Sequence, residues 1–322
     1  MQTRLLQLAI LLICLSGCTN EHTNTPAFYI WKSKLDVQDA DTAYLNTLGA
    51  KKIYARMFDV DNKGNGVFPT ADYSPSFSLG SPGFRQEVVP VIFITNKAIR
   101  QCTAADIEKL ARNCADRIDT LYRLHFNKLP TEYQFDCDWT EKTKENYFNF
   151  LNHIRKLRKG VPISCTIRLH QIKFKDKTGI PPVHKGTLMY YASSEPTDFE
   201  NKNTILNNKD AASYIERNPF GQIKLINGVR KATIDARPDY YQPTKDGIYS
   251  ILQSHYINGV WVNKDYELKV EEVSPETLLE AAKLLRKKLR KENREIIFYH
   301  LDKEIIKQYS TEQLINIINT FS

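Results

Sequence analysis

Short runs of β-branched and aromatic residues alternate with longer segments of helical periodicity through most of the chain. Each run has the length of a strand, and a strand followed by a helix, repeated many times, is typical of a parallel sheet. The sequence therefore predicts strands at 28–31, 52–58, 88–95, 132–138, 162–170, 186–191 and 295–301.

The intervening segments carry helix signals. Between 147 and 157, apolar residues recur every three or four positions, which predicts a helix with one buried face. Three helix starts are marked by side chains that can cap the first turn. They are Thr103 with Asp106, Ser274 followed by Pro275, and Ser310 with Gln313.

Seven such strands favour a closed (β/α)8 barrel of the TIM type over an open, doubly wound α/β sheet. The missing strand, the seventh of eight, belongs between 218 and 272, where 231–236 and 257–262 are both candidates. No internal repeat or Pro/Gly-rich linker divides the chain, so we expect one domain over 28–322.

The amino-terminal segment has the pattern of a signal peptide. Arg4 precedes an apolar stretch at 5–15, which is too short to span a membrane as a stable helix. The tetrad Leu-Ser-Gly-Cys that ends at Cys18 resembles the lipobox of bacterial lipoproteins. This resemblance implies cleavage after residue 17, a lipid on Cys18 and a polar tether over 18–27.

A lipid on Cys18 would hold the protein to a membrane without a spanning helix. Thr19 is not aspartate, which favours the outer membrane of a Gram-negative cell envelope. The net charge of +8 is spread along the chain, and its densest cluster, 286–294, fits a solvated helix face. Together with secretion, this argues against a nucleic-acid partner.

Four cysteines remain after the predicted signal and lipid site: Cys102, Cys114, Cys137 and Cys165. Their spacing fits no zinc or redox motif. Buried thiols are favoured over disulfides in a domain of this size, although an oxidising compartment would permit pairing.

Candidate chemistry lies where the strands end, because the carboxyl ends of barrel strands face the reaction site. Several of these positions carry side chains that suit sugars: aromatic rings for stacking, and charged or amide groups for hydroxyls. The expected substrate-binding residues are Trp31, Arg56, Asn96, Trp139, Arg168, His170, Gln171, Tyr191, His300 and Asp302. For His300 and Asp302, a structural role is an equal alternative, because Asp302 could cap the following helix.

The fourth predicted strand ends in two carboxylates, Asp136 and Asp138, whose spacing places them on one face. Two carboxylates in a barrel lumen repel each other, so they need hydrogen bonds or a neutralising cation. The guanidinium group of Arg168 could be that cation. An ion-pair network without chemistry is the alternative. A divalent metal with His170 is conceivable, but no ligand motif supports it, so we expect no metal. No phosphate loop or dinucleotide fingerprint is present, so we also expect no cofactor.

The segment Asp136-Cys137-Asp138-Trp139 resembles the fourth strand of glycoside hydrolase family 18, the chitinases and related proteins. That family ends the strand with Asp-x-Asp-x-Glu. Here Thr140 occupies the glutamate position, and Glu141 follows one place later. A second similarity is Met189-Tyr190-Tyr191, which matches the family's Met-x-Tyr-Asp except that Ala192 replaces the aspartate.

The resemblance implies a TIM barrel that acts on glycans, with the substrate acetamido group as nucleophile and the glutamate as proton donor. Because the glutamate is missing, the leading hypothesis is a glycoside hydrolase-like protein in which Asp136, Asp138 or Glu141 supplies the acid or base. The alternative is a glycan-binding or surface-assembly lipoprotein without catalysis. Further phrases resemble a group of bacterial barrel lipoproteins that has no assigned activity: 93–96, 166–171 and 298–302.

Overall fold

The computed structural model describes residues 22–32, 36–62, 67–72, 83–191, 203–214, 221–226, 247–257, 260–264, 267–271, 273–289 and 292–321. The predicted signal peptide and Cys18 lie outside these residues. Among the described helices, none combines the length and the apolar character needed to cross a membrane.

Eight parallel strands form a closed ring, as predicted for a TIM-type barrel. Each strand is paired with two neighbours, and the ring closes because β1 pairs with both β2 and β13. In order around the ring the strands are β1 (Asn24–Ile30), β2 (Lys52–Asn62), β4 (Glu87–Ile94), β5 (Tyr133–Cys137), β6 (Ile163–Arg168), β7 (Lys185–Tyr190), β8 (Gly221–Ile226) and β13 (Arg294–Tyr299).

All seven predicted strands are present, with shifted ends. β1 begins at Asn24, within the segment expected to be a tether, and β6 ends at Arg168 rather than at residue 170. The seventh strand of the ring lies in the predicted interval 218–272, but it is neither of the two candidate segments. Strand β8 pairs with β7 and β13, whereas 257–262 covers parts of two short antiparallel strands, and 231–236 lies outside the described residues.

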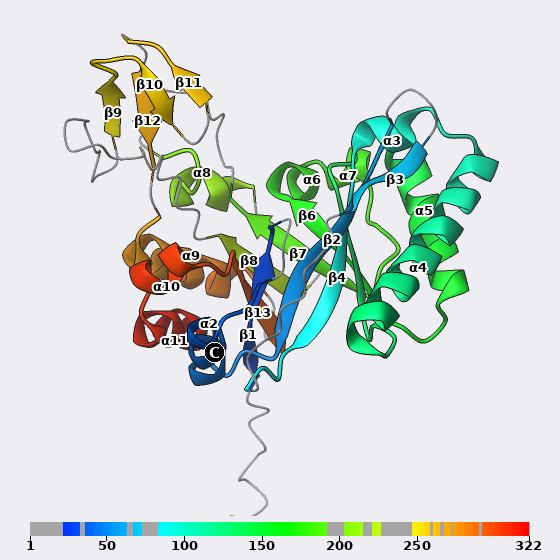
Figure 1. Ribbon diagram of the computed structural model, residues 1–322, viewed down its shortest axis with the longest axis horizontal. Helices are drawn as coiled ribbons and strands as arrows, with labels where there is room; N and C mark the ends of the chain where they lie inside the picture. The colour runs from blue at the N-terminus through cyan, green and yellow to red at the C-terminus, as the bar shows by residue number, and fades with distance from the viewer. Residues whose placement is uncertain are drawn as a thin grey trace, which may run out of the picture.

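Helices cover the outside of the ring (Figure 1). The predicted caps are confirmed: Thr103, Ser274 and Ser310 each accept a hydrogen bond from the first turn that follows. The helices are α2 (Asp39–Thr47), α3 (Asn96–Arg100), α4 (Ala104–Phe126), α5 (Lys144–Leu157), α6 (Leu169–Lys173), α7 (Lys175–Thr178), α8 (Asn208–Ser213), α9 (Pro275–Lys288), α10 (Lys303–Gln308) and α11 (Thr311–Thr320).

In the described part of the chain, five further strands lie outside the ring. β3 (Val67–Asp72) runs antiparallel to the distal half of β2. Between β8 and α9 the chain forms two small antiparallel pairs, which project away from the barrel in Figure 1. They are β9 (Gly247–Ser250) with β12 (Glu267–Val270), and β10 (His255–Ile257) with β11 (Val260–Val262).

The apolar core lies between the strands and the helices. Phe135 of β5, for example, packs edge-on against Phe150 of α5, with ring centroids 5.1 Å apart. Cys137 also faces this layer, as predicted. It is a free thiol, as are Cys102, Cys114 and Cys165, which confirms the expectation of unpaired cysteines; three of the four are buried.

The lumen of the barrel is polar at its amino-terminal end. The carboxylate of Glu132, 1% exposed, accepts hydrogen bonds from the ammonium groups of Lys52 and Lys185, both at 2.8 Å, and from the Ser164 hydroxyl at 2.7 Å. Glu295 pairs with Lys52 at 3.0 Å. This network closes the lower end of the lumen with charges that neutralise one another.

Candidate functional site

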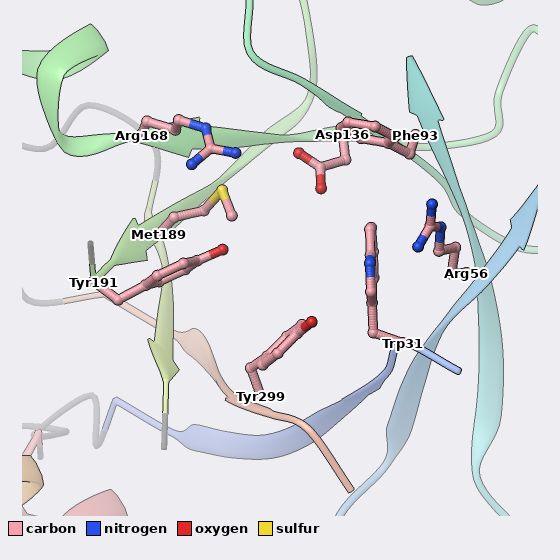
Figure 2. A pocket seen from close by; sticks show the side chains of 8 residues that line it. All are labelled: Trp31, Arg56, Phe93, Asp136, Arg168, Met189, Tyr191 and Tyr299. Atoms are coloured by element: carbon pink, nitrogen blue, oxygen red, sulfur yellow. The ribbon is translucent and has the colours of Figure 1, made fainter. Parts of the chain in front are cut away.

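A cavity of about 260 Å³ opens at the carboxyl ends of the strands. Its walls combine aromatic rings with charged groups, and Figure 2 shows these side chains turned toward a common space. The lining residues come from β1, β2, β4, β5, β6, β7 and β13 or from the positions directly after them. They are Trp31, Arg56, Phe93, Asp136, Arg168, Met189, Tyr191 and Tyr299.

Strand register explains why these residues meet. Asp136 of β5 is the direct register partner of Phe93 in β4. Arg168 of β6 is likewise the partner of Met189 in β7. Because side chains alternate between the two faces of a strand, residues at matching inward positions line one level of the lumen. The predicted convergence of Asp136 and Arg168 is therefore present in the structure.

Asp136 is the acidic residue of the cavity. Its side chain points into the cavity in Figure 2, and the residue is 4% exposed. The Thr166 hydroxyl of the next strand donates a hydrogen bond of 2.5 Å to Oδ1. The carboxylate thus has a fixed position at the base of the cavity.

Arg168 and Asp138 form a two-pronged ion pair at the rim. The guanidinium donates from Nε to Oδ1 and from Nη2 to Oδ2, the latter at 2.6 Å. Arg168 is thus the cationic partner that the sequence suggested for these carboxylates, and it pairs with Asp138. Asp138 does not line the cavity, because β5 ends at Cys137 and the residue lies beyond the strand.

Arg56 has a comparable arrangement on the opposite wall. Its Nε donates to Oδ1 of Asp59 at 2.7 Å, and its Nη2 contacts the other oxygen of that carboxylate. The guanidinium carbon lies 4.9 Å from the ring centre of Trp31 and 5.6 Å from that of Phe93. Cation–π attraction of this kind fixes both the arginine and the rings.

The aromatic residues form a continuous wall. Trp31 contacts Phe93 and Tyr299 with ring centroids 6.5 and 6.3 Å apart, and Tyr191 stacks against Tyr299 at 6.5 Å with an interplanar angle of 23°. Burial, with a further contribution from Asp136, raises the pKa of Tyr191. Its hydroxyl therefore stays protonated and can donate a hydrogen bond.

The base of the cavity is closed by a second polar layer. The Tyr29 hydroxyl donates to the side-chain oxygen of Gln134, whose amide nitrogen donates to Thr187 at 3.1 Å and to Ser164 at 3.3 Å. Burial, followed by the charge of Asp136, raises the pKa of Tyr29. This layer joins the cavity to the Glu132 network below it.

Three residues predicted to bind substrate lie outside the cavity lining and make contacts within the fold. Trp139 is fully buried, donates to the Thr178 carbonyl at 2.9 Å and stacks on Tyr147, so its ring is closed to a sugar. Gln171 is buried and bridges the Arg168 amide and the Trp139 carbonyl. Asn96 donates to the Asp138 carbonyl and accepts from Thr143.

Four further predicted residues lie outside the cavity lining. Glu141 is exposed in the turn before α5, and His170 is exposed on α6 because β6 ends two residues before it. Asp302 caps α10 through Ile305 and contacts His300 Nε2 at 2.6 Å. Asp302 therefore caps α10, as the structural alternative expected.

Three lining residues were missed: Phe93, Met189 and Tyr299. Each lies inside a predicted strand, but the search for binding residues favoured the polar residues nearby. Alternation supplies the signal for Met189, since it lies two places before Tyr191. Among the described residues, no group of three or more His, Cys, Asp or Glu side chains gathers as a metal site would require.

Comparisons with known proteins give no sequence match, since neither a family model nor a curated protein matches the chain. Solved structures do match. A chitinase from Chromobacterium violaceum has a TM-score of 0.52 at 12% identity, over 91% of this chain and 98% of that one. A chitinase from Bacteroides thetaiotaomicron gives 0.52 at 11% identity, over 93% and 95% of the two chains.

A chitinase from Rhizomucor miehei gives a TM-score of 0.51 at 9% identity, over 91% of this chain and all of that one. The similarity extends over the whole described barrel rather than over a local motif. This chain therefore has the TIM-barrel fold of the chitinases.

Proposed function

We propose that the protein binds a glycan at the mouth of its barrel without cleaving it by the acid-dependent route of family 18. The observation that carries the proposal is the cavity itself. It has an aromatic wall and one inward carboxylate, while the position of the proton donor, Thr140, carries no acid. Glu141, the nearest substitute, is exposed and outside the lining.

The shape and chemistry of the cavity support a sugar as its ligand. At about 260 Å³ it is slightly smaller than the roughly 300–1,000 Å³ of pockets that hold drug-sized molecules, which suits one sugar ring. The apolar C–H face of a sugar can lie against Trp31 or Tyr299. Hydroxyl groups can then donate to Asp136 and accept from Tyr191.

Hydrolysis needs a proton donor within hydrogen-bond reach of the glycosidic oxygen. Both carboxylate oxygens of Asp138 already accept hydrogen bonds from Arg168, and Asp138 lies outside the cavity lining, so it is poorly placed to donate a proton to a bound sugar. Barrels host many chemistries, so the fold alone decides neither ligand nor reaction. The cavity supports a sugar as the ligand, and the lack of an acid at Thr140 argues against cleavage.

Tryptophan fluorescence tests this proposal, because the three tryptophans have different surroundings. Trp31 lines the cavity, Trp139 is buried in the core, and Trp261 is exposed on β11. We expect chito-oligosaccharides to change the emission of the wild type and of Trp261→Ala, but not of Trp31→Phe. The same oligosaccharides should remain intact in a chromatographic assay.

Hydrolysis by Asp136 is the second candidate, supported by the orientation of that carboxylate into the cavity. Products that disappear in Asp136→Asn but persist in Glu141→Gln would favour it. The absence of both binding and turnover across a broad panel of oligosaccharides would remove the glycan proposal altogether.

We also propose that the chain is an outer-membrane lipoprotein anchored through Cys18. The lipobox-like tetrad supports this, and the first strand begins only six residues after Cys18, at Asn24. Metabolic labelling with a fatty-acid analogue should mark the wild type and not Cys18→Ser. Equal labelling of both would contradict the proposal.

A further inference from the structure

The cavity contains a carboxylate without a cationic partner. Asp136 accepts a hydrogen bond from Thr166, and among the described residues it has no ion pair with a lysine or arginine. It is 4% exposed, so little water reaches it. A charge taken out of water in this way is costly unless another group compensates it.

The two arginines of the cavity are already neutralised from outside it. Arg168 forms an ion pair with Asp138, and Arg56 forms one with Asp59. In each pair, two guanidinium nitrogens donate to the carboxylate. Neither aspartate lines the cavity. The charges of Asp138 and Asp59 therefore balance those of the two arginines. Within the described residues, the carboxylate of Asp136 is left with no positive charge to balance it.

The surrounding rings add to the attraction for a cation. Tyr191 and Tyr299 stack on one side of the space, and Trp31 lies opposite Tyr191 in Figure 2. The faces of aromatic rings carry negative potential, and rings arranged around a space attract ammonium groups. Asp136 and these rings therefore favour the same kind of ligand.

We propose that the cavity selects an amino sugar whose amine is unacetylated and protonated, with the ammonium group against Asp136. This inference rests on the proposed glycan binding and names the sugar. An N-acetylated sugar would offer a neutral amide N–H and would leave the Asp136 charge uncompensated. A uronic acid would place a second negative charge beside it.

The test compares two sets of oligosaccharides of equal length, one of glucosamine and one of N-acetylglucosamine, by titration calorimetry at a pH where the amines are protonated. We expect the glucosamine set to bind at least about tenfold more tightly, which corresponds to about 1.4 kcal/mol. This preference should weaken as salt is added, since it comes from a charge–charge contact.

Two variants locate the effect. Asp136→Asn keeps the shape of the side chain and removes its charge, so the preference should fall to within about twofold, a difference of about 0.4 kcal/mol. Glu141→Gln is the matched control, because it removes a negative charge from the exposed turn after β5, outside the cavity. It should retain the preference.

The outcomes separate this inference from the proposed function. Equal or tighter binding of the N-acetylated set by the wild type would overturn the amino-sugar inference and leave glycan binding intact. Failure of both sets to bind, with other glycans bound, would also overturn it. The wild-type comparison decides the matter even if Asp136→Asn does not fold.

Discussion

Arg168 holds Asp138 through Nε and Nη2 at the rim of the barrel, and this fork keeps the arginine's charge neutralised beside the cavity. The pair joins the end of β6 to the residue directly after β5. Its role is electrostatic more than structural, because both side chains are about one third exposed, at 30% and 38%.

The first prediction concerns this pair. Asp138→Ala leaves the Arg168 charge uncompensated, so affinity for a cationic sugar should fall about tenfold. The free energy of unfolding should change by less than about 1 kcal/mol, because solvent screens the pair. Calorimetric titration and urea denaturation measure the two effects. A large loss of stability without a change in affinity would contradict this assignment.

The buried network of Glu132, Lys52 and Lys185, in contrast to the partly exposed Arg168–Asp138 pair, should contribute strongly to stability. Glu132→Gln leaves the ammonium groups of Lys52 and Lys185 without their shared carboxylate, and we expect a loss of about 3–5 kcal/mol of unfolding free energy. Glu108→Gln, in an exposed pair with Arg112, is the matched control and should change little. Urea denaturation of the two variants provides the comparison.

The same network gives a pH dependence. Burial alone would raise the pKa of Glu132, but the charges and hydrogen bonds of Lys52 and Lys185 outweigh it and hold the pKa below its ordinary value. The folded state therefore binds the proton less readily than the unfolded state. Its stabilising contribution should be complete above the unfolded pKa and be lost as pH falls through the folded value. Glu132→Gln should flatten this acid limb.

Trp31 and Trp139 should respond to truncation in contrasting ways. Trp139→Ala removes a fully buried ring from the core and should cost about 3–5 kcal/mol of stability. Trp31→Ala opens a cavity wall and should mainly weaken sugar binding. Thermal unfolding and titration of both variants test the contrast. Similar losses of binding in two equally folded variants would assign Trp139 a role that its burial does not indicate.

Removal of the helix cap at Asp302 should lower the free energy of unfolding by less than the changes at Glu132 or Trp139. Asp302→Ala should cost about 1 kcal/mol, because the Ile305 amide loses its acceptor, whereas Asp302→Asn should retain most of the cap. Burial would raise the pKa of Asp302, but hydrogen bonds from His300 and the Ile305 amide keep it lowered. The contribution is thus lost as pH falls through the folded pKa, which denaturation at several pH values can follow.

The barrel could be predicted because its strands carry strong local patterns, whereas β8 does not. Its sequence, Gly-Gln-Ile-Lys-Leu-Ile, has a glutamine at the second position and a lysine, Lys224, at the fourth. The segment 257–262 contains more apolar residues and was therefore one of the two candidates, with 231–236 as the other. What identifies β8 is its pairing with β7 and β13, which is tertiary information.

The site was predicted in part for a related reason. Alternation correctly placed Asp136 in the lumen, but it stops applying where a strand ends. β5 ends at Cys137, so Trp139 turns into the core. β6 ends at Arg168, and Gln171 accepts from the Arg168 amide to begin α6, which carries His170 away. Arginine is not among the residues that usually precede a helix, so the start of α6 could not be read from the sequence.

The layer of Tyr29, Gln134 and Thr187 seals the lumen beneath Asp136, and this has a kinetic consequence. The recess is a blind-ended well, so a bound molecule has to leave by the route through which it arrived. Association and dissociation rates should both respond to changes around the opening, such as at Arg56 or Arg168, while substitutions under the seal should leave those rates unaltered in any variant that remains folded.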